Sequence, residues 1–114
     1  MNTTISDTDS NGWKYKAIEN TYYKNIVNQP SVSLSSSGVS GDTKELWSTV
    51  PPAGFSDFSK FEIQCTGLMG SGSGVVLRWQ GGTDRLRLFA RNTANYPNQD
   101  TGSWHAYIRL VKVS

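Results

Sequence analysis

The chain has 114 residues, of which 36% are hydrophobic and 18% are charged, and its formal net charge is only +2. This length suits one domain with one core, and the small charge argues against a nucleic-acid partner, which usually meets a dense field of Lys and Arg. The presence of 4 Trp, 5 Tyr and 4 Phe argues against disorder, so we expect a folded domain rich in turns.

The cysteine content and the hydropathy of the sequence exclude further classes of protein. Cys65 is the only cysteine, which excludes an intrachain disulfide and a zinc site built from several cysteines. No apolar run approaches the ~18 residues that span a bilayer, and residues 1–10 lack the basic start and apolar centre of a secretion signal. We expect a soluble protein without membrane insertion and, as given, without an export signal.

The N-terminal part divides into a polar stretch and weak strands. Residues 1–11 are acidic and rich in Thr and Ser, so we expect a linker or the start of a fragment there, and a single domain over 12–114. Residues 13–17 alternate between apolar and polar side chains, as strands require. Shorter strands are expected over 22–27 and 32–34.

The middle of the chain contains a loop and two further strands. Residues 35–42 are dominated by Gly and Ser and should form an exposed loop. A short strand over 46–50 is stopped by Pro51 and Pro52. Over 60–66 apolar and polar side chains alternate strictly, the pattern of a sheet with one wet face.

The C-terminal part has the strongest strand pattern. A Gly- and Ser-rich turn over 67–74 leads into a strand over 75–80, and Gly-Gly then marks a hairpin to a strand over 85–91. A long loop over 92–102 precedes the terminal strand, 103–113.

About seven or eight short strands at intervals of roughly 8 to 12 residues predict an all-β, antiparallel β-sandwich with a jelly-roll-like character. The expected core residues are Trp13, Tyr15, Leu46, Phe61, Ile63, Cys65, Val75, Leu77, Trp79, Leu86, Leu88, Ala90, Ile108 and Leu110.

Enzymatic readings find little support in the sequence. Cys65 and His105 could form a nucleophile and base, but Cys65 belongs to the apolar row of its strand, where cysteines behave as small hydrophobes. A glycosidase would need paired carboxylates, but the candidates stand in no motif, and Asp42, Asp57, Asp84 and Asp100 lie in expected turns. The glycine-rich segment 67–74 lacks the Lys-Ser/Thr end of a phosphate-binding loop. We expect no cofactor, no metal site and no catalytic residue.

The charge distribution singles out the C-terminal third, because every arginine lies within 75–114. Alternation places one group of side chains on one face of the strand 85–91 and a second group on one face of the terminal strand. The first group is Arg85, Arg87, Phe89 and Arg91, and the second is Tyr107 and Arg109. If these strands belong to one sheet, one wet face carries Arg and aromatic groups together.

Such a face suits an acidic glycan, because guanidinium groups grip carboxylates and aromatic rings stack on sugars. Two alternatives stay open: a solvated sheet face without a ligand, and the seam of an oligomer. The loops add Tyr96 and Trp104, whose rings could also stack on sugars.

Three features of the sequence suggest a family. They are the strong terminal β segment 104–114, the loop before it, which is rich in Asn, Thr, Gly and Tyr, and the polar start of the chain. Together they resemble the C-terminal receptor-binding tip domain of a bacteriophage tail fibre or tailspike, or of a related bacteriocin fibre. The resemblance covers the character of 75–114 and the composition of the whole chain. It implies a homotrimer at a fibre tip, in a virion tail or another extracellular particle, that recognises bacterial polysaccharide or lipopolysaccharide.

The first hypothesis is therefore a carbohydrate- or receptor-binding module, not an enzyme, that recognises a cell-surface glycan, acidic ones included. The alternatives are a structural trimerisation or capping domain of a fibre without its own ligand and, third, a small glycan-processing enzyme. The candidate ligand-binding residues are Arg85, Arg87, Arg91, Arg109, Tyr96, Trp104 and Tyr107.

Overall fold

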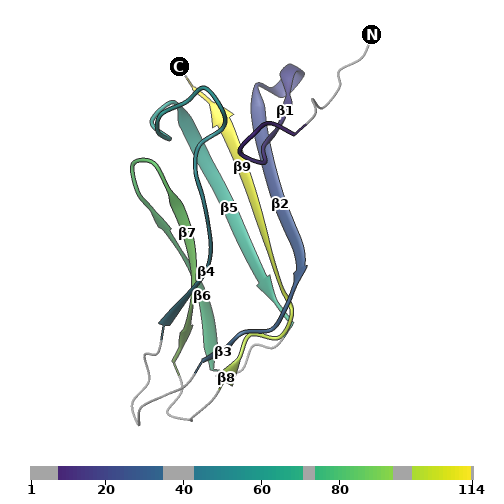
Figure 1. The fold of residues 1–114 in the computed structure, drawn as a ribbon, viewed down its shortest axis with the longest axis vertical. Coiled ribbons are helices and arrows are strands. Elements are labelled where there is room, and N and C mark those ends of the chain that lie inside the picture. The colour runs from purple at the N-terminus through teal and green to yellow at the C-terminus, as the bar shows by residue number, and fades with distance from the viewer. Residues whose placement is uncertain (1–7, 35–42, 71–73, 94–98, 114) are drawn as a thin grey trace.

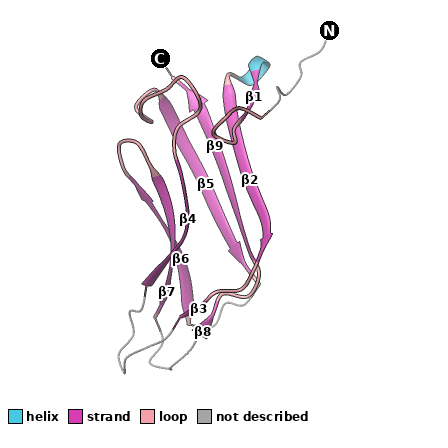
Figure 2. Cartoon of the chain, viewed as in Figure 1, coloured by secondary structure: helices cyan, strands magenta, loops and turns pink. Residues whose placement is uncertain are grey.

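The structure is a computed structural model that describes residues 8–34, 43–70, 74–93 and 99–113. Within these ranges the regular structure is β-strand apart from one short 3-10 helix (Figures 1 and 2). The elements are β1 (Lys14–Lys16), η1 (Ala17–Glu19), β2 (Thr21–Gln29), β3 (Ser33–Leu34), β4 (Thr43–Thr49), β5 (Phe61–Met69), β6 (Val75–Gly81), β7 (Leu86–Asn92), β8 (Gln99–Asp100) and β9 (Trp104–Lys112). The expected loop over 35–42 lies outside the described residues.

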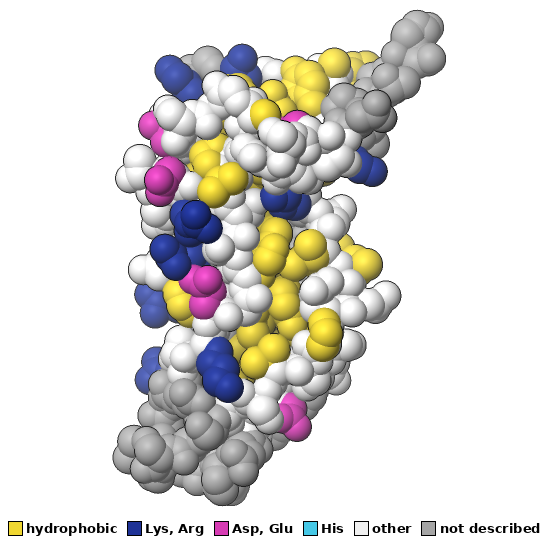
Figure 3. All heavy atoms as spheres, in the orientation of Figure 1, with side chains coloured by type: hydrophobic (Ala, Val, Ile, Leu, Met, Phe, Trp, Pro, Cys, Tyr) yellow, Lys and Arg dark blue, Asp and Glu magenta, His cyan; other side chains and the backbone are white. Residues whose placement is uncertain are grey.

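Two antiparallel sheets form the body of the molecule. The four-stranded sheet has the order β1-β2-β9-β5 and the three-stranded sheet has the order β4-β7-β6, while β3 pairs with β8. The two sheets face each other (Figure 1), and apolar side chains form a strip between them in the space-filling view (Figure 3). The prediction of an all-β antiparallel sandwich is confirmed.

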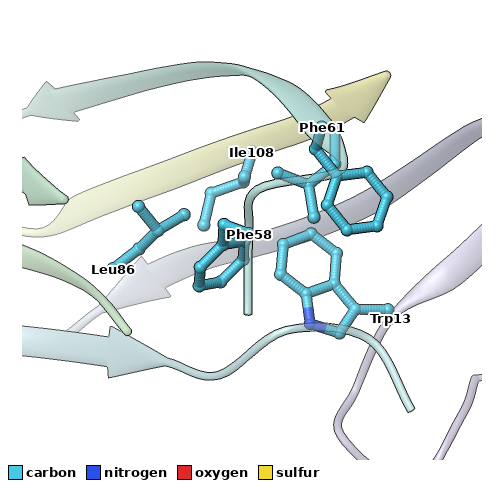
Figure 4. Close-up of a cluster of buried hydrophobic side chains, with 6 residues drawn as sticks. Trp13, Phe58, Phe61, Leu86 and Ile108 are labelled. Atoms are coloured by element: carbon cyan, nitrogen blue, oxygen red, sulfur yellow. The ribbon is translucent and has the colours of Figure 1, made fainter. Parts of the chain in front are cut away.

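The core consists of alternate side chains from both sheets. Leu86, Leu88 and Ala90 of β7 are buried, and so are the alternate residues of β9 from Trp104 to Leu110. One cluster joins Leu86 to Phe61 and Ile108 of the other sheet, and Phe58 lies between Leu86 and the rings of Phe61 and Trp13 (Figure 4). Full burial of one such aliphatic side chain stabilises the fold by about 1.5–3 kcal/mol.

Most of the expected core residues lie between the sheets, and the exceptions occupy edge strands. Ile63 is 37% exposed because β5 is the last strand of its sheet. Tyr15, Leu46, Cys65, Leu77 and Trp79 are half-buried. In the hydrophobic core of the described residues, the members that the sequence pattern did not single out are Leu34, Phe58, Trp104 and Ala106.

Hydrogen bonds connect the segment before β1 to the rest of the domain, beginning at a residue closer to the N-terminus than the sequence predicted. Asp9 accepts hydrogen bonds from the backbone amides of Asn11, Trp13 and Ala53, at 2.8, 2.9 and 3.1 Å. The Trp13 indole N–H donates to the Val50 carbonyl at 2.8 Å. The ordered domain therefore includes Asp9, which the sequence had assigned to the linker over 1–11.

Lys24 points inward from β2 although it is charged. Its Nζ donates to the carbonyl of Asn11 and to Thr49 Oγ1, and it lies 5.0 Å from the Trp13 ring centroid and 5.7 Å from that of Trp47. Burial lowers the pKa of the Lys24 ammonium below its ordinary value. Since Thr49 belongs to β4, Lys24 of β2 joins the two sheets.

Gly12 leaves room for Lys24, and replacing it with Ala should destabilise the fold. Gly12 has φ +88°, and an added Cβ would lie 2.8 Å from Lys24 Cε. Gly54→Ala is the matched control, because Gly54 has φ +93° but no atom within 4 Å of an added Cβ. The left-handed backbone alone should cost about 1–2 kcal/mol in either variant.

Because Gly12→Ala must also displace Lys24 from its hydrogen bonds, its loss of unfolding free energy should exceed that of Gly54→Ala by at least about 1 kcal/mol. Urea denaturation of both variants measures this difference. Equal losses would mean that Lys24 is not held at this position.

The buried ammonium of Lys24 should also make stability depend on alkaline pH. With its pKa lowered in the folded state, the unfolded chain binds more protons between that pKa and the ordinary value of 10.5, so stability rises with pH there. Lys24→Met keeps the aliphatic stem and removes this titration. We expect wild type to gain unfolding free energy relative to Lys24→Met from pH 7 to pH 10. Urea titrations at both pH values measure the unfolding free energy of wild type minus that of Lys24→Met. A value at pH 10 equal to or below the value at pH 7 would contradict the burial of this charge.

Candidate functional site

The two groups of predicted site residues lie on opposite faces of the sandwich. Arg87 and Arg91 project outward from β7, and Arg85 just before it donates to Ser48 Oγ at 3.0 Å. Tyr107 and Arg109 project outward from β9, in the other sheet. The expectation of one shared Arg-aromatic face required both strands in one sheet, and this condition is not met.

Trp104 and Tyr96 do not add an exposed ring in the described part of the chain. Trp104 is only 4% exposed and packs in a cluster with Leu88 and Ala106. Its prediction as a ligand-stacking residue is wrong, because the inward row of β9 begins at Trp104 itself. Tyr96 lies outside the described residues.

A trough of about 330 Å³ crosses the outer face of the four-stranded sheet. We call it the Tyr107 trough. Its lining residues are Tyr23, Asn25, Gln64, Thr66, Tyr107, Ile108 and Arg109. They come from β2, β9 and β5, which lie side by side, so the trough is built on regular, hydrogen-bonded backbone.

Strand register arranges these side chains in two rows across the sheet. In the first row Tyr107 lies directly between Asn25 and Thr66. The Cβ atoms of such directly opposed residues are about 4.5–5.5 Å apart. A half-buried aromatic ring is thus bracketed by an amide and a hydroxyl.

The second row places Arg109 between Tyr23 and Gln64. The Arg109 guanidinium carbon lies 6.0 Å from the Tyr23 ring centroid, and Nη2 lies 3.9 Å from Glu19 Oε1. With 47% of its side chain exposed, Arg109 keeps access to a ligand. The trough therefore combines two rings, two amides, a hydroxyl and one cation.

Glu19 orients the Tyr23 end of the trough. The Tyr23 hydroxyl donates to Glu19 Oε1, and Lys16 Nζ lies 3.1 Å from Glu19 Oε2. These hydrogen bonds lower the pKa of the Glu19 carboxyl, and the bond to Glu19 raises the pKa of the Tyr23 phenol. Tyr23 is therefore a neutral ring fixed by its hydroxyl.

His105 extends the aromatic row at the other end. Its ring is stacked with that of Tyr107, with centroids 6.4 Å apart and planes 15° apart. His105 Nδ1 accepts a hydrogen bond of 3.0 Å from the backbone amide of Asn28. This bond sets the ring orientation, so the row along β9 runs from an imidazole through a phenol ring to a guanidinium.

A hollow of about 380 Å³ lies at the loop before β5, lined by residues that include Phe55, Asp57, Lys60 and Lys112. Asp57 accepts hydrogen bonds from the Ser59 amide and hydroxyl, at 3.0 and 2.6 Å. These bonds lower the pKa of its carboxyl. Because Asp57 is used in this turn and Phe55 packs toward Phe61, at 4.8 Å between centroids, the hollow presents fewer free groups than the Tyr107 trough.

The catalytic pair considered from the sequence does not assemble. Cys65 faces inward on β5, opposite Ile108, whereas His105 lies on the outer face of the same sheet, opposite Leu68. Burial raises the pKa of the Cys65 thiol. Among the described residues there is no group of three or more His, Cys, Asp or Glu side chains that could hold a metal ion. Nor does that part of the chain contain a helix long and apolar enough to cross a membrane.

Sequence reasoning identified Tyr107 and Arg109 but missed their neighbours. The missed side chains are Tyr23, Asn25, Gln64 and Thr66. Gln64 and Thr66 had been placed on a wet strand face, and the signal that could have singled them out was the pairing of that strand with the terminal one.

No protein family, no curated protein and no solved structure matches this chain. The functional argument therefore starts from the chemistry of the Tyr107 trough.

Proposed function

We propose that the chain is a carbohydrate-binding module and that the Tyr107 trough receives a glycan of a cell surface. The observation that carries the proposal is the position of Tyr107, a ring on an open sheet face with Asn25 on one side and Thr66 on the other. A sugar ring has apolar C–H faces and a rim of hydroxyls. It therefore needs a flat apolar partner beneath it and hydrogen-bonding groups beside it.

The remaining trough residues support the same ligand class. The amides of Asn25 and Gln64 offer both donors and acceptors, which suits hydroxyls that can act in either role. Arg109 offers paired donors to a sugar hydroxyl or carboxylate. Because Glu19 holds Tyr23 and the Asn28 amide holds His105, these two rings lose little side-chain entropy on binding.

The shape of the trough favours a polymer over a single sugar. The row from His105 to Arg109 covers four strand steps, or about 14 Å at 3.4 Å per residue. The trough lies open across a sheet face, so a glycan chain can continue past it in both directions. We propose an internal segment of a polysaccharide as the ligand, in keeping with a role in attachment to a bacterial surface.

Tyr107→Ala should weaken glycan binding by at least tenfold, since it removes the stacking surface at the centre of the site. The probe is an array of bacterial surface polysaccharides, followed by calorimetric titration of the uncharged polysaccharide that binds best, so that the arginine-bearing face around Phe89 takes no part in the binding. Phe89→Ala is the matched control, because Phe89 is also a half-buried, outward ring in a central strand but lies on the opposite sheet.

We expect Phe89→Ala to retain binding of that polysaccharide within about twofold, with both variants showing the far-UV spectrum of wild type. Loss of binding in Phe89→Ala but not in Tyr107→Ala would place the site elsewhere. A wild-type chain that binds no polysaccharide on the array would contradict the proposed function itself.

A further inference from the structure

The outer face of the three-stranded sheet has a different chemistry from the Tyr107 trough. Strand register centres it on Phe89, which lies between Glu45 of β4 and Arg78 of β6. Arg87 and Arg91 lie on either side of Phe89 along β7. In the space-filling view, Lys and Arg side chains gather along the side formed by this sheet (Figure 3).

The arginines of this face differ in whether they have a partner. Arg87 is paired with Glu45 at 2.6 Å, and Arg85 donates to Ser48. For Arg78 and Arg91, the described residues provide no carboxylate within ion-pair distance. Two exposed guanidinium groups therefore lie beside the Phe89 ring with their charge uncompensated by a near carboxylate of that part of the chain.

These groups enclose a discrete hollow of about 200 Å³. Its lining residues are Thr43, Arg78, Gln80, Phe89 and Arg91. Arg87 does not line it. The lining of the hollow thus includes Arg78 and Arg91, which have no carboxylate partner among the described residues, together with one flat ring and one amide.

We propose that this hollow, which we call the Phe89 site, binds the carboxylate-bearing sugar rings of an acidic polysaccharide. A guanidinium grips a carboxylate through two parallel hydrogen bonds, and the phenyl ring offers a stacking surface for the sugar ring that carries it. Gln80 can donate to or accept from a neighbouring hydroxyl. The two positive charges call for a negatively charged ligand, and the Phe89 ring beside them favours a ligand with a flat apolar face.

A nucleic acid also combines rings with negative charge, but the surroundings of the site favour the sugar. The formal net charge of the chain is only +2, and Glu45 lies directly across from Phe89 on the same face. Nucleic-acid surfaces instead track several phosphates with a continuous row of Lys and Arg. The Phe89 site offers a cavity for about one ring, flanked by an acidic residue.

The Phe89 site is independent of the Tyr107 trough, because the two lie on outer faces of different sheets with the core between them. The inference goes beyond the proposed function, since it assigns a second ligand-binding surface with its own charge preference. Each site can be inactivated without touching the other.

The test measures binding of polygalacturonate, an acidic polysaccharide, at low salt. Arg78→Gln/Arg91→Gln should lower its affinity by at least tenfold, since both charged partners of the carboxylate are lost. The matched control is Arg85→Gln/Arg87→Gln, which removes the same charge from the same face without touching the lining of the hollow. We expect this control to lower the affinity by less than threefold. A thermal melt confirms that every variant is folded.

Each other outcome overturns the inference in its own way. Equal losses in the two double variants would indicate a diffuse field of positive charge. Equal affinity for a carboxyl-reduced, neutral form of the polymer would remove the carboxylate from the recognition. Tighter binding of single-stranded DNA than of polygalacturonate would favour a nucleic acid. Failure of wild type to bind polygalacturonate would refute the Phe89 site while leaving the Tyr107 trough, tested separately with the polysaccharide array, unaffected.

Discussion

The inward packing of β9 is the constraint on which both the core and the proposed glycan site depend. Four alternate side chains of this strand are at most 4% exposed. They are Trp104, Ala106, Ile108 and Leu110. Since successive strand residues point to opposite faces, burying these four turns His105, Tyr107 and Arg109 outward. A slip of one residue would bury the site and expose the core, so the hydrophobic packing that specifies the register also specifies the position of the trough.

In the neighbouring strand β2, the inward orientation of Lys24 likewise determines which side chains point outward. Its ammonium loses hydration between the sheets, and bonds to Asn11 and Thr49 together with the rings of Trp13 and Trp47 offset that loss. Because Lys24 is held inward from β2, its neighbours in the strand, Tyr23 and Asn25, must point outward into the trough. A charged residue in the inward row thus helps to orient two uncharged side chains of the proposed glycan site on the other face.

Strands with strict alternation could be located from sequence, because local periodicity reports which residues share a face. Tyr107 and Arg109 were assigned to an outer face for this reason. Periodicity does not indicate which strands share a sheet. The hypothesis of one Arg-aromatic face therefore combined the arginines of β7 with Arg109 of β9, although these strands belong to different sheets. Tyr23 and Asn25 were missed because the inward row of β2 contains Lys24, which interrupts the apolar period. Trp104 was misassigned because it was grouped with the loop residues before the terminal strand, although the alternation that turns Ile108 and Leu110 inward also turns Trp104 inward.

A two-sheet sandwich with a dry interior leaves two wet faces on which side chains can change without disturbing the core. Here the two faces differ: one presents uncharged hydrogen-bonding groups and one cation around Tyr107, and the other presents Arg78 and Arg91 beside Phe89, with no carboxylate of the described residues within ion-pair distance. Since the whole domain separates them, one short oligosaccharide cannot reach both. A long or branched polysaccharide can, and its second contact would then form at the raised effective concentration that tethering provides. Two modest sites on opposite faces would therefore favour dense polymer surfaces over free sugars in solution.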